Sequence, residues 1–184
     1  MRLFLFLYPI TEYLDALCGK NSNPARLNEI VNARYRERGY SVNWLLFSEG
    51  TDPTKPDLSA VSPLFSIKQE DRVIVAGVSF FTHTTKEVYP KPSFILSQLP
   101  TQTHRLVVGG FHQWDCVDKV AAFAHRSGID TFVDEDTTEL FFRGFSRAEI
   151  PLVRNQFTLR NYGVPEKYIG FVREGRKDKP WLTQ

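Results

Sequence analysis

The sequence predicts an α/β fold in three layers, a mostly parallel sheet with helices on both faces. Several short runs are almost continuously apolar, as in strands that are covered on both sides. These runs are Leu3 to Tyr8, Val42 to Phe47, Arg105 to Gly109 and Ile129 to Val133. Segments with helical spacing alternate with them, and this alternation is typical of an open parallel sheet.

The first half of the chain supplies one β-α-β unit and a long loop. Asn23 and Pro24 offer a helix cap and a first-turn proline, apolar residues follow at helical spacing, and Gly39 is the predicted stop. Residues 49–71 contain three prolines and form no periodic pattern. A loop of this length suggests a functional loop or an insertion.

The middle of the chain is less regular. Arg72 to Phe81 is predicted as a strand, with Gly77 marking a bulge or a close approach. Glu87 to Lys91 is a candidate short strand, although Pro90 argues against a central position. Ser93 to Leu99 is a candidate short helix.

The second half returns to the α/β alternation. Cys116 to Ser127 has apolar residues on one helical face and is followed by Gly128, a typical helix stop. Asp134 to Thr137 is predicted to open a loop or a helix. Further on, Arg147 to Asn161 is predicted as an interrupted helix and Tyr168 to Val172 as a last strand.

Composition indicates one globular domain over residues 1–184. The net charge is +2, which gives no case for nucleic-acid binding, and no run approaches the length of a membrane span. The basic run Arg173 to Lys179 is interpreted as part of a flexible tail, residues 173–184. The two cysteines, Cys18 and Cys116, fit a reduced, cytoplasmic protein.

Cys116 is the residue with the strongest chemical signal. It follows a predicted central strand and opens a helix, where unpaired N–H groups and the helix dipole favour the nucleophilic thiolate. We therefore expect a lowered pKa and faster alkylation than at Cys18. The alternative is a small buried side chain that only packs.

The spacing around Cys116 is similar to that of a known enzyme family. Gly110, Cys116-Val117, Gly128 and Asp136 follow one another at the intervals found in the isochorismatase-like cysteine hydrolases. Lys91 before Ser93 to Leu99 resembles a shortened form of the family's lysine segment. The resemblance implies a three-layer, Rossmann-like fold and hydrolysis of an amide or related bond of a small molecule.

The same resemblance implies a set of catalytic positions. Cys116 would be the nucleophile, and Lys91, with Lys86 as a rival, would stabilise the thiolate. The family's catalytic aspartate falls on Tyr8, whose phenol titrates near pH ~10 and is a poor base. Glu12 and Asp115 are substitute proton acceptors in the hydrolase interpretation.

Three interpretations of function therefore stay open. The first is a cysteine hydrolase, and the second is a catalytically silent relative that binds a small molecule or a protein partner. In the third, the spacing is accidental and the chain is an unrelated doubly wound ligand-binding protein. In each case, the chain could also assemble into a homo-oligomer.

Several further residues are candidates for contacts with a small-molecule ligand. His112 and Trp114, beside Cys116, and Phe94 are predicted to bind substrate, although His112 and Trp114 are as well explained by packing. His83 is assigned to the surface in preference to a pocket. The metal motif of nicotinamidases is absent from Ser48 to Leu64, and we predict neither a metal nor a cofactor.

Overall fold

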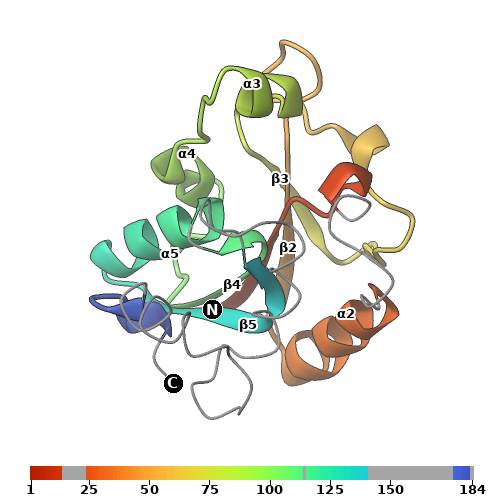
Figure 1. Ribbon diagram of the computed structural model, residues 1–184. Helices are drawn as coiled ribbons and strands as arrows, with labels where there is room; N and C mark the ends of the chain where they lie inside the picture. Colours follow the sequence, from red (N-terminus) through yellow and green to blue (C-terminus); the bar gives the residue numbers. More distant parts are fainter. Residues whose placement is uncertain (14–23, 114, 141–175, 183–184) are drawn as a thin grey trace, which may run out of the picture.

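The computed structural model describes residues 1–13, 24–113, 115–140 and 176–182, and within them the chain forms one parallel sheet of five strands (Figure 1). The strand order is β3-β2-β1-β4-β5, and every neighbouring pair is parallel. The strands are β1 (Arg2–Leu7), β2 (Ser41–Leu46), β3 (Arg72–Val75), β4 (Arg105–Gln113) and β5 (Asp130–Leu140). The predicted α/β fold with a parallel sheet is confirmed.

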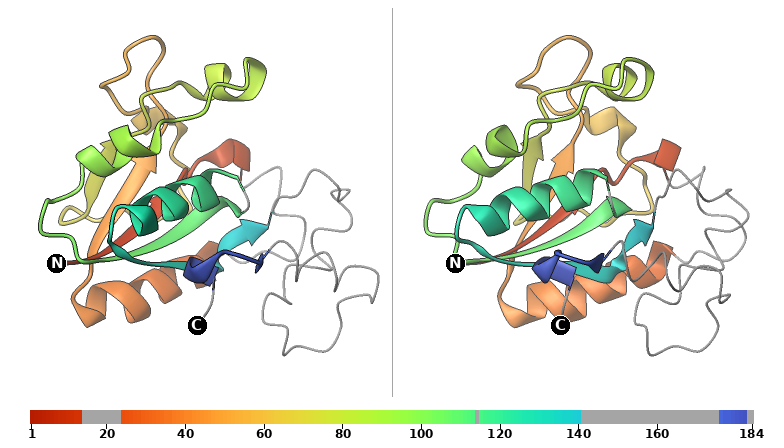
Figure 2. Two further views of the ribbon diagram at one scale, coloured as in Figure 1. Left: turned by 90° about the vertical axis from the view of Figure 1, so that its left-hand side faces the viewer. Right: turned by 60° about the vertical axis from the view of Figure 1, so that its left-hand side comes forward.

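Helices cover both faces of this sheet, as Figures 1 and 2 show. One face carries α2 (Pro24–Ile30), which continues as η1 (Val31–Tyr35) and η2 (Arg36–Arg38). The other carries α4 (Pro92–Ser97) and α5 (Cys116–Arg126), which contact each other. The short helix α3 (Phe80–Thr85) lies beyond the end of β3, and η3 (Leu58–Ala60) is in the long loop after β2.

The core covers β1 on both faces, because the continuous apolar run of this strand leaves no polar face. Phe4 and Phe6 point to the same face, as alternate residues of a strand do, and the Phe4 ring stacks on that of Tyr35 with centroids 3.9 Å apart. Next to it, Phe6 contacts the rings of Trp44 and Phe65 at 5.4 and 5.1 Å. This packing fixes β1 at the centre of the sheet, where its carboxyl end can contribute to a site.

Three of the predicted elements differ from the structure. The strand expected to reach Phe81 ends at Val75, because Gly77 turns the chain at φ +77° and the Ser79 side chain then caps α3. Residues 87–91 form no strand. Residues 134–137 continue β5 instead of opening a loop, because β5 pairs with β4 beyond a register shift, up to Leu140.

The expected tail is packed over residues 176–182, which end in η4 (Pro180–Leu182) beside β5 and α5 (Figure 2). Trp181 and Leu182 are buried, and the indole of Trp181 donates to Asp118 at 2.6 Å. Arg176 pairs with Glu135 at 2.5 Å. The expectation of a flexible tail is therefore wrong for this stretch, because its apolar and paired side chains outweigh its basic character. The elements predicted at 147–161 and 168–172 lie outside the described residues.

The described residues contain no helix long and apolar enough to cross a membrane.

A buried ion pair ties η2 to the start of β3. Arg36 binds Asp71 through Nε at 3.0 Å and through a second guanidinium nitrogen, and the Trp44 indole donates to the same carboxylate at 2.8 Å. Burial alone would raise the pKa of Asp71, but these hydrogen bonds outweigh burial and lower it. The ionised form of Asp71 is therefore the form that stabilises the fold.

Asp71→Asn is expected to reduce the free energy of unfolding at neutral pH by about 2–3 kcal/mol, the value of hydrogen bonds to a charged group. Because folding lowers the pKa of Asp71, its contribution is present above the unfolded pKa of about 3.9 and is lost as pH falls through the folded value. Urea denaturation of both proteins across this range should show the difference shrinking in acid. A difference that is constant with pH would contradict this assignment.

Candidate functional site

The strand order places two candidate residues at one point of the sheet. The order reverses between β1 and β4, and open parallel sheets bind ligands at such a switch point, beyond the carboxyl ends of the strands. Tyr8 follows β1 directly, and Cys116 begins the helix after β4. The structure therefore brings Tyr8 and Cys116 to the same edge.

Cys116 is the first residue of α5, as predicted, but the pKa of its thiol is raised and not lowered. The residue is only 5% exposed. Burial and the neighbouring Asp115 carboxylate raise the pKa of Cys116 to about 12, although Tyr8 and Lys119 lower it in part. The expected low pKa is wrong because desolvation of the thiolate outweighs the helix dipole.

We expect the Cys116 thiol to alkylate slowly in the native protein at neutral pH. In a Cys18→Ser background, its reaction with iodoacetamide should be much slower than in the chain unfolded by guanidinium chloride, because the thiolate is the reacting form. The native rate should rise steadily as pH increases. A native rate at neutral pH equal to or above the unfolded rate would contradict the raised pKa.

Tyr8, the residue on which the sequence resemblance places the family's aspartate, is completely buried. Its ring stacks on Phe47, with centroids 4.1 Å apart. Within the described residues its hydroxyl makes no hydrogen bond of regular geometry, yet it lies near enough to the Cys116 thiol for each group to perturb the other's pKa. Burial, followed by the charge of Cys116, raises the pKa of Tyr8 well above its ordinary value, so Tyr8 is a neutral phenol and not a base.

His83 is the residue that the sequence interpretation missed. It lies on α3, half-buried, and its Nε2 is 3.8 Å from the Cys116 Sγ. Its Nδ1 is 3.0 Å from the carbonyl oxygen of Val88. Because a carbonyl only accepts, this contact requires a proton on Nδ1, and in the neutral tautomer of this kind the lone pair is on Nε2, the nitrogen nearer the thiol.

Asp115 completes a compact polar cluster with these two residues. One ligand-type atom from each of His83, Asp115 and Cys116 lies within 4.8 Å of the others. Asp115 Oδ1 binds Lys119 Nζ at 2.5 Å, and Lys119 lies over the Tyr89 ring, 3.2 Å from its centroid. Asp115 is the N-cap residue of α5, but its side chain makes no capping hydrogen bond. The first N–H groups of α5 therefore do not bind this carboxylate.

The other predicted site residues are placed elsewhere or differently. Lys91 is exposed at the N-cap of α4, and Lys86 is exposed at the end of α3. Neither contacts Cys116, and the cation that lowers the pKa of the thiol in part is Lys119. Phe94 is 36% exposed, and its ring packs on Gly77. The His112 ring lies edge-on to Tyr13, with centroids 4.8 Å apart. Trp114 lies outside the described residues.

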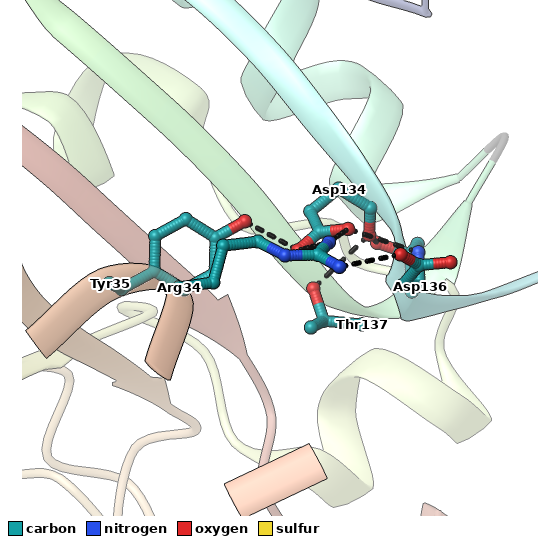
Figure 3. A network of polar contacts seen from close by, with 6 residues as sticks. Arg34, Tyr35, Asp134, Asp136 and Thr137 are labelled. Carbon is teal, nitrogen blue, oxygen red and sulfur yellow. Dashed lines mark hydrogen bonds and ion pairs between the residues drawn. The ribbon is translucent and has the colours of Figure 1, made fainter. Parts of the chain in front are cut away.

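Two acidic residues of β5, Asp134 and Asp136, belong to a network of polar contacts with η1 (Figure 3). Arg34 donates to both oxygens of Asp134 at 2.8 and 2.9 Å and to Asp136 at 2.8 Å. The Tyr35 hydroxyl donates to Asp134 as well. Asp136, the last residue in the matching spacing, therefore joins β5 to η1 instead of contacting Cys116.

Comparison with known proteins agrees with this architecture. An isochorismatase from Pseudomonas putida aligns over 87% of this chain and 84% of its own, with a TM-score of 0.50 and 18% identity. An isochorismatase family protein from Desulfovibrio vulgaris aligns over 84% and 90%, with a TM-score of 0.52 and 13% identity. The chain has the isochorismatase fold.

A third structure with the isochorismatase fold is the pyrazinamidase of Pyrococcus horikoshii, solved in complex with zinc. It aligns over 84% of this chain and 94% of its own, with a TM-score of 0.51 and 8% identity. No family model matches the sequence, and no curated protein matches it. The likeness therefore concerns the fold, and function has to be argued from the site.

Proposed function

We propose that this protein with the isochorismatase fold is a cysteine hydrolase in which His83 takes the proton of the Cys116 thiol. The observation that carries the proposal is the 3.8 Å contact between Sγ and Nε2, with Nδ1 held by the Val88 carbonyl. A nucleophile beside a base, with the base oriented by a third group, is the general arrangement of covalent catalysis. The substrate class is an amide or related carbonyl compound of small size.

The thiol rests in its protonated form, because the pKa of Cys116 is raised to about 12 by burial and by Asp115. The thiol proton moves to His83 Nε2 as Sγ forms its bond to the substrate carbonyl carbon. The imidazolium then returns this proton to the leaving nitrogen as the C–N bond breaks, which leaves a thioester. Water attacks the thioester while His83 accepts its proton, and the proton returns to Sγ when the acid departs.

The start of α5 supports stabilisation of the developing oxyanion. The first N–H groups of a helix have no partner within the helix, and Asp115 does not cap them with its side chain. Such donors, together with the positive end of the helix dipole, stabilise negative charge next to the nucleophile.

A second candidate function is supported by Tyr8. This residue fills the position of the family's aspartate with a neutral, buried ring, and burial keeps the Cys116 thiol protonated. These features favour a silent relative that binds a small molecule or a protein partner without turning it over. The two candidates differ in whether His83 is a sufficient base.

Turnover of a panel of small aromatic and aliphatic amides and esters distinguishes the two candidates. The hydrolase proposal expects wild-type activity that Cys116→Ser removes, and Tyr8→Asp should not be needed for it. If the wild type is inert and Tyr8→Asp gains activity that depends on Cys116, the silent candidate holds. Activity that survives Cys116→Ser would refute both, because the thiol would have no role.

A further inference from the structure

We propose that His83, Asp115 and Cys116 form a binding site for a soft divalent cation, with Zn²⁺ as the best fit, and that the bound metal blocks hydrolysis. The metal site stands on the geometry of the three side chains. The blocking effect rests on the proposed function, because it assumes that Cys116 and His83 are the nucleophile and the base. This site lies beyond β4 and differs from the segment after β2 where the sequence lacks a metal motif.

The distances suit a tetrahedral ion. The three ligand atoms lie within 4.8 Å of one another, and Sγ and Nε2 are 3.8 Å apart. Zinc bonds of about 2.3 Å to sulfur and about 2.0–2.1 Å to nitrogen place two tetrahedral ligands about 3.6 Å apart. Small side-chain adjustments therefore bring the sulfur and the nitrogen to one ion.

The kinds of ligand select the metal. A thiolate with an imidazole favours zinc or a similar transition-metal ion, whereas Mg²⁺ and Ca²⁺ prefer oxygen ligands throughout. The contact of His83 Nδ1 with the Val88 carbonyl is the outer contact that commonly orients a metal-binding histidine and leaves Nε2 for the ion. Asp115 still has a second carboxylate oxygen besides the one bound to Lys119.

A fourth position is open in this arrangement, as in zinc sites with three protein ligands and a water molecule. Tyr8 is an independent sign of a missing polar partner here. It is completely buried, its hydroxyl perturbs the Cys116 thiol, and it makes no hydrogen bond of regular geometry within the described residues. A metal-bound water would supply a partner for this hydroxyl.

Metal binding would exclude catalysis by occupying both reacting atoms. The ion replaces the thiol proton, which leaves to solvent, and it takes the Nε2 lone pair that otherwise accepts a proton from the thiol. Sγ then cannot attack a carbonyl carbon, and His83 cannot act as a base. Removal of the metal by a chelator restores both groups.

Cobalt titration of the purified full-length protein tests the site without any substrate. Metal-free protein should bind about one Co²⁺ per chain with a thiolate-to-cobalt charge-transfer band, and Zn²⁺ should displace it. Cys116→Ser should remove the band, and His83→Gln and Asp115→Asn should each weaken binding by about tenfold or more. Cys18→Ser and His125→Gln are the matched controls and should bind as the wild type does.

The outcomes separate this inference from the proposed function. Absence of the charge-transfer band, or a band that survives Cys116→Ser, would overturn the metal site. If the site binds Zn²⁺ but metal-free protein hydrolyses nothing, the proposed function fails and the metal site stands. If metal-free protein is active and one equivalent of bound Zn²⁺ leaves its rate unchanged, the blocking effect is wrong.

Discussion

Replacing His83 with glutamine is expected to lower kcat/KM for the best substrate of the panel by about 10²–10⁴-fold, the usual contribution of a general base. Glutamine keeps much of the side-chain volume but cannot accept and return a proton. The effect should appear in kcat more than in KM, because the proton moves only in the transition state. Steady-state kinetics in buffer with a chelator measures the change without interference from bound metal.

His125→Gln is the matched control for this substitution. His125 is exposed on α5 and its ring lies 5.8 Å from that of Trp181, away from the Cys116 cluster. It should retain wild-type kcat and KM. If His83→Gln also stays within about threefold of the wild type, His83 is not the base and the 3.8 Å contact with Cys116 is only packing.

Gly110→Ala is expected to reduce the free energy of unfolding by about 4 kcal/mol or more, and the substituted chain should accumulate poorly as soluble protein. Gly110 has φ +108°, which a side chain rarely adopts, and an added Cβ would lie 2.2 Å from the Leu7 carbonyl oxygen and 2.5 Å from the Leu7 nitrogen. Conformational strain of about 1–3 kcal/mol adds to an overpacking cost of about 1–3 kcal/mol. The clash is with backbone of β1, so no side chain can move to relieve it.

Gly128→Ala separates these two causes. Gly128 also has a positive φ, +83°, but nothing lies within 4 Å of an added Cβ. Gly128→Ala should therefore reduce the free energy of unfolding only by the cost of the left-handed conformation, about 1–2 kcal/mol. Urea denaturation of both variants measures the difference, and equal losses would show that backbone crowding between β1 and β4 is not the larger cause.

The central strands could be predicted from sequence because burial on both faces leaves a direct mark. Leu3 to Leu7 has no polar residue, and the structure covers this strand on both sides. The end of β3 was predicted incorrectly, because Phe80 to Thr85 consists of aromatic and β-branched residues that favour strands, apart from His83. Gly77 and the Ser79 cap decide the local structure there, and helix α3 results.

The candidate site was less accessible to sequence reasoning. His83 and Cys116 are 33 residues apart, and their contact depends on where α3 lies beyond the sheet. No periodic pattern carries that information, although both residues follow strands whose carboxyl ends lie on one edge. The prediction for Lys91 depends on the resemblance of Ser93 to Leu99 to the family's lysine segment, and in the structure Lys91 is exposed at the N-cap of α4.

The state of the thiol could not be predicted for a related reason. The position of Cys116 at a helix start is visible in the sequence and favours the thiolate. The opposing effect is the burial of the side chain by elements that are distant in sequence, and burial is the larger of the two. Helix position therefore located the candidate nucleophile without fixing its protonation.

The most direct test of the Cys116–His83 pair is acylation by 4-nitrophenyl acetate, which does not require the natural substrate. In metal-free buffer at neutral pH, mass spectrometry of the Cys18→Ser protein should show one acetyl group on Cys116. His83→Gln in the same background should form this adduct at least about tenfold more slowly. Absence of acetylation at Cys116, or an equal rate in the His83→Gln protein, would contradict the account.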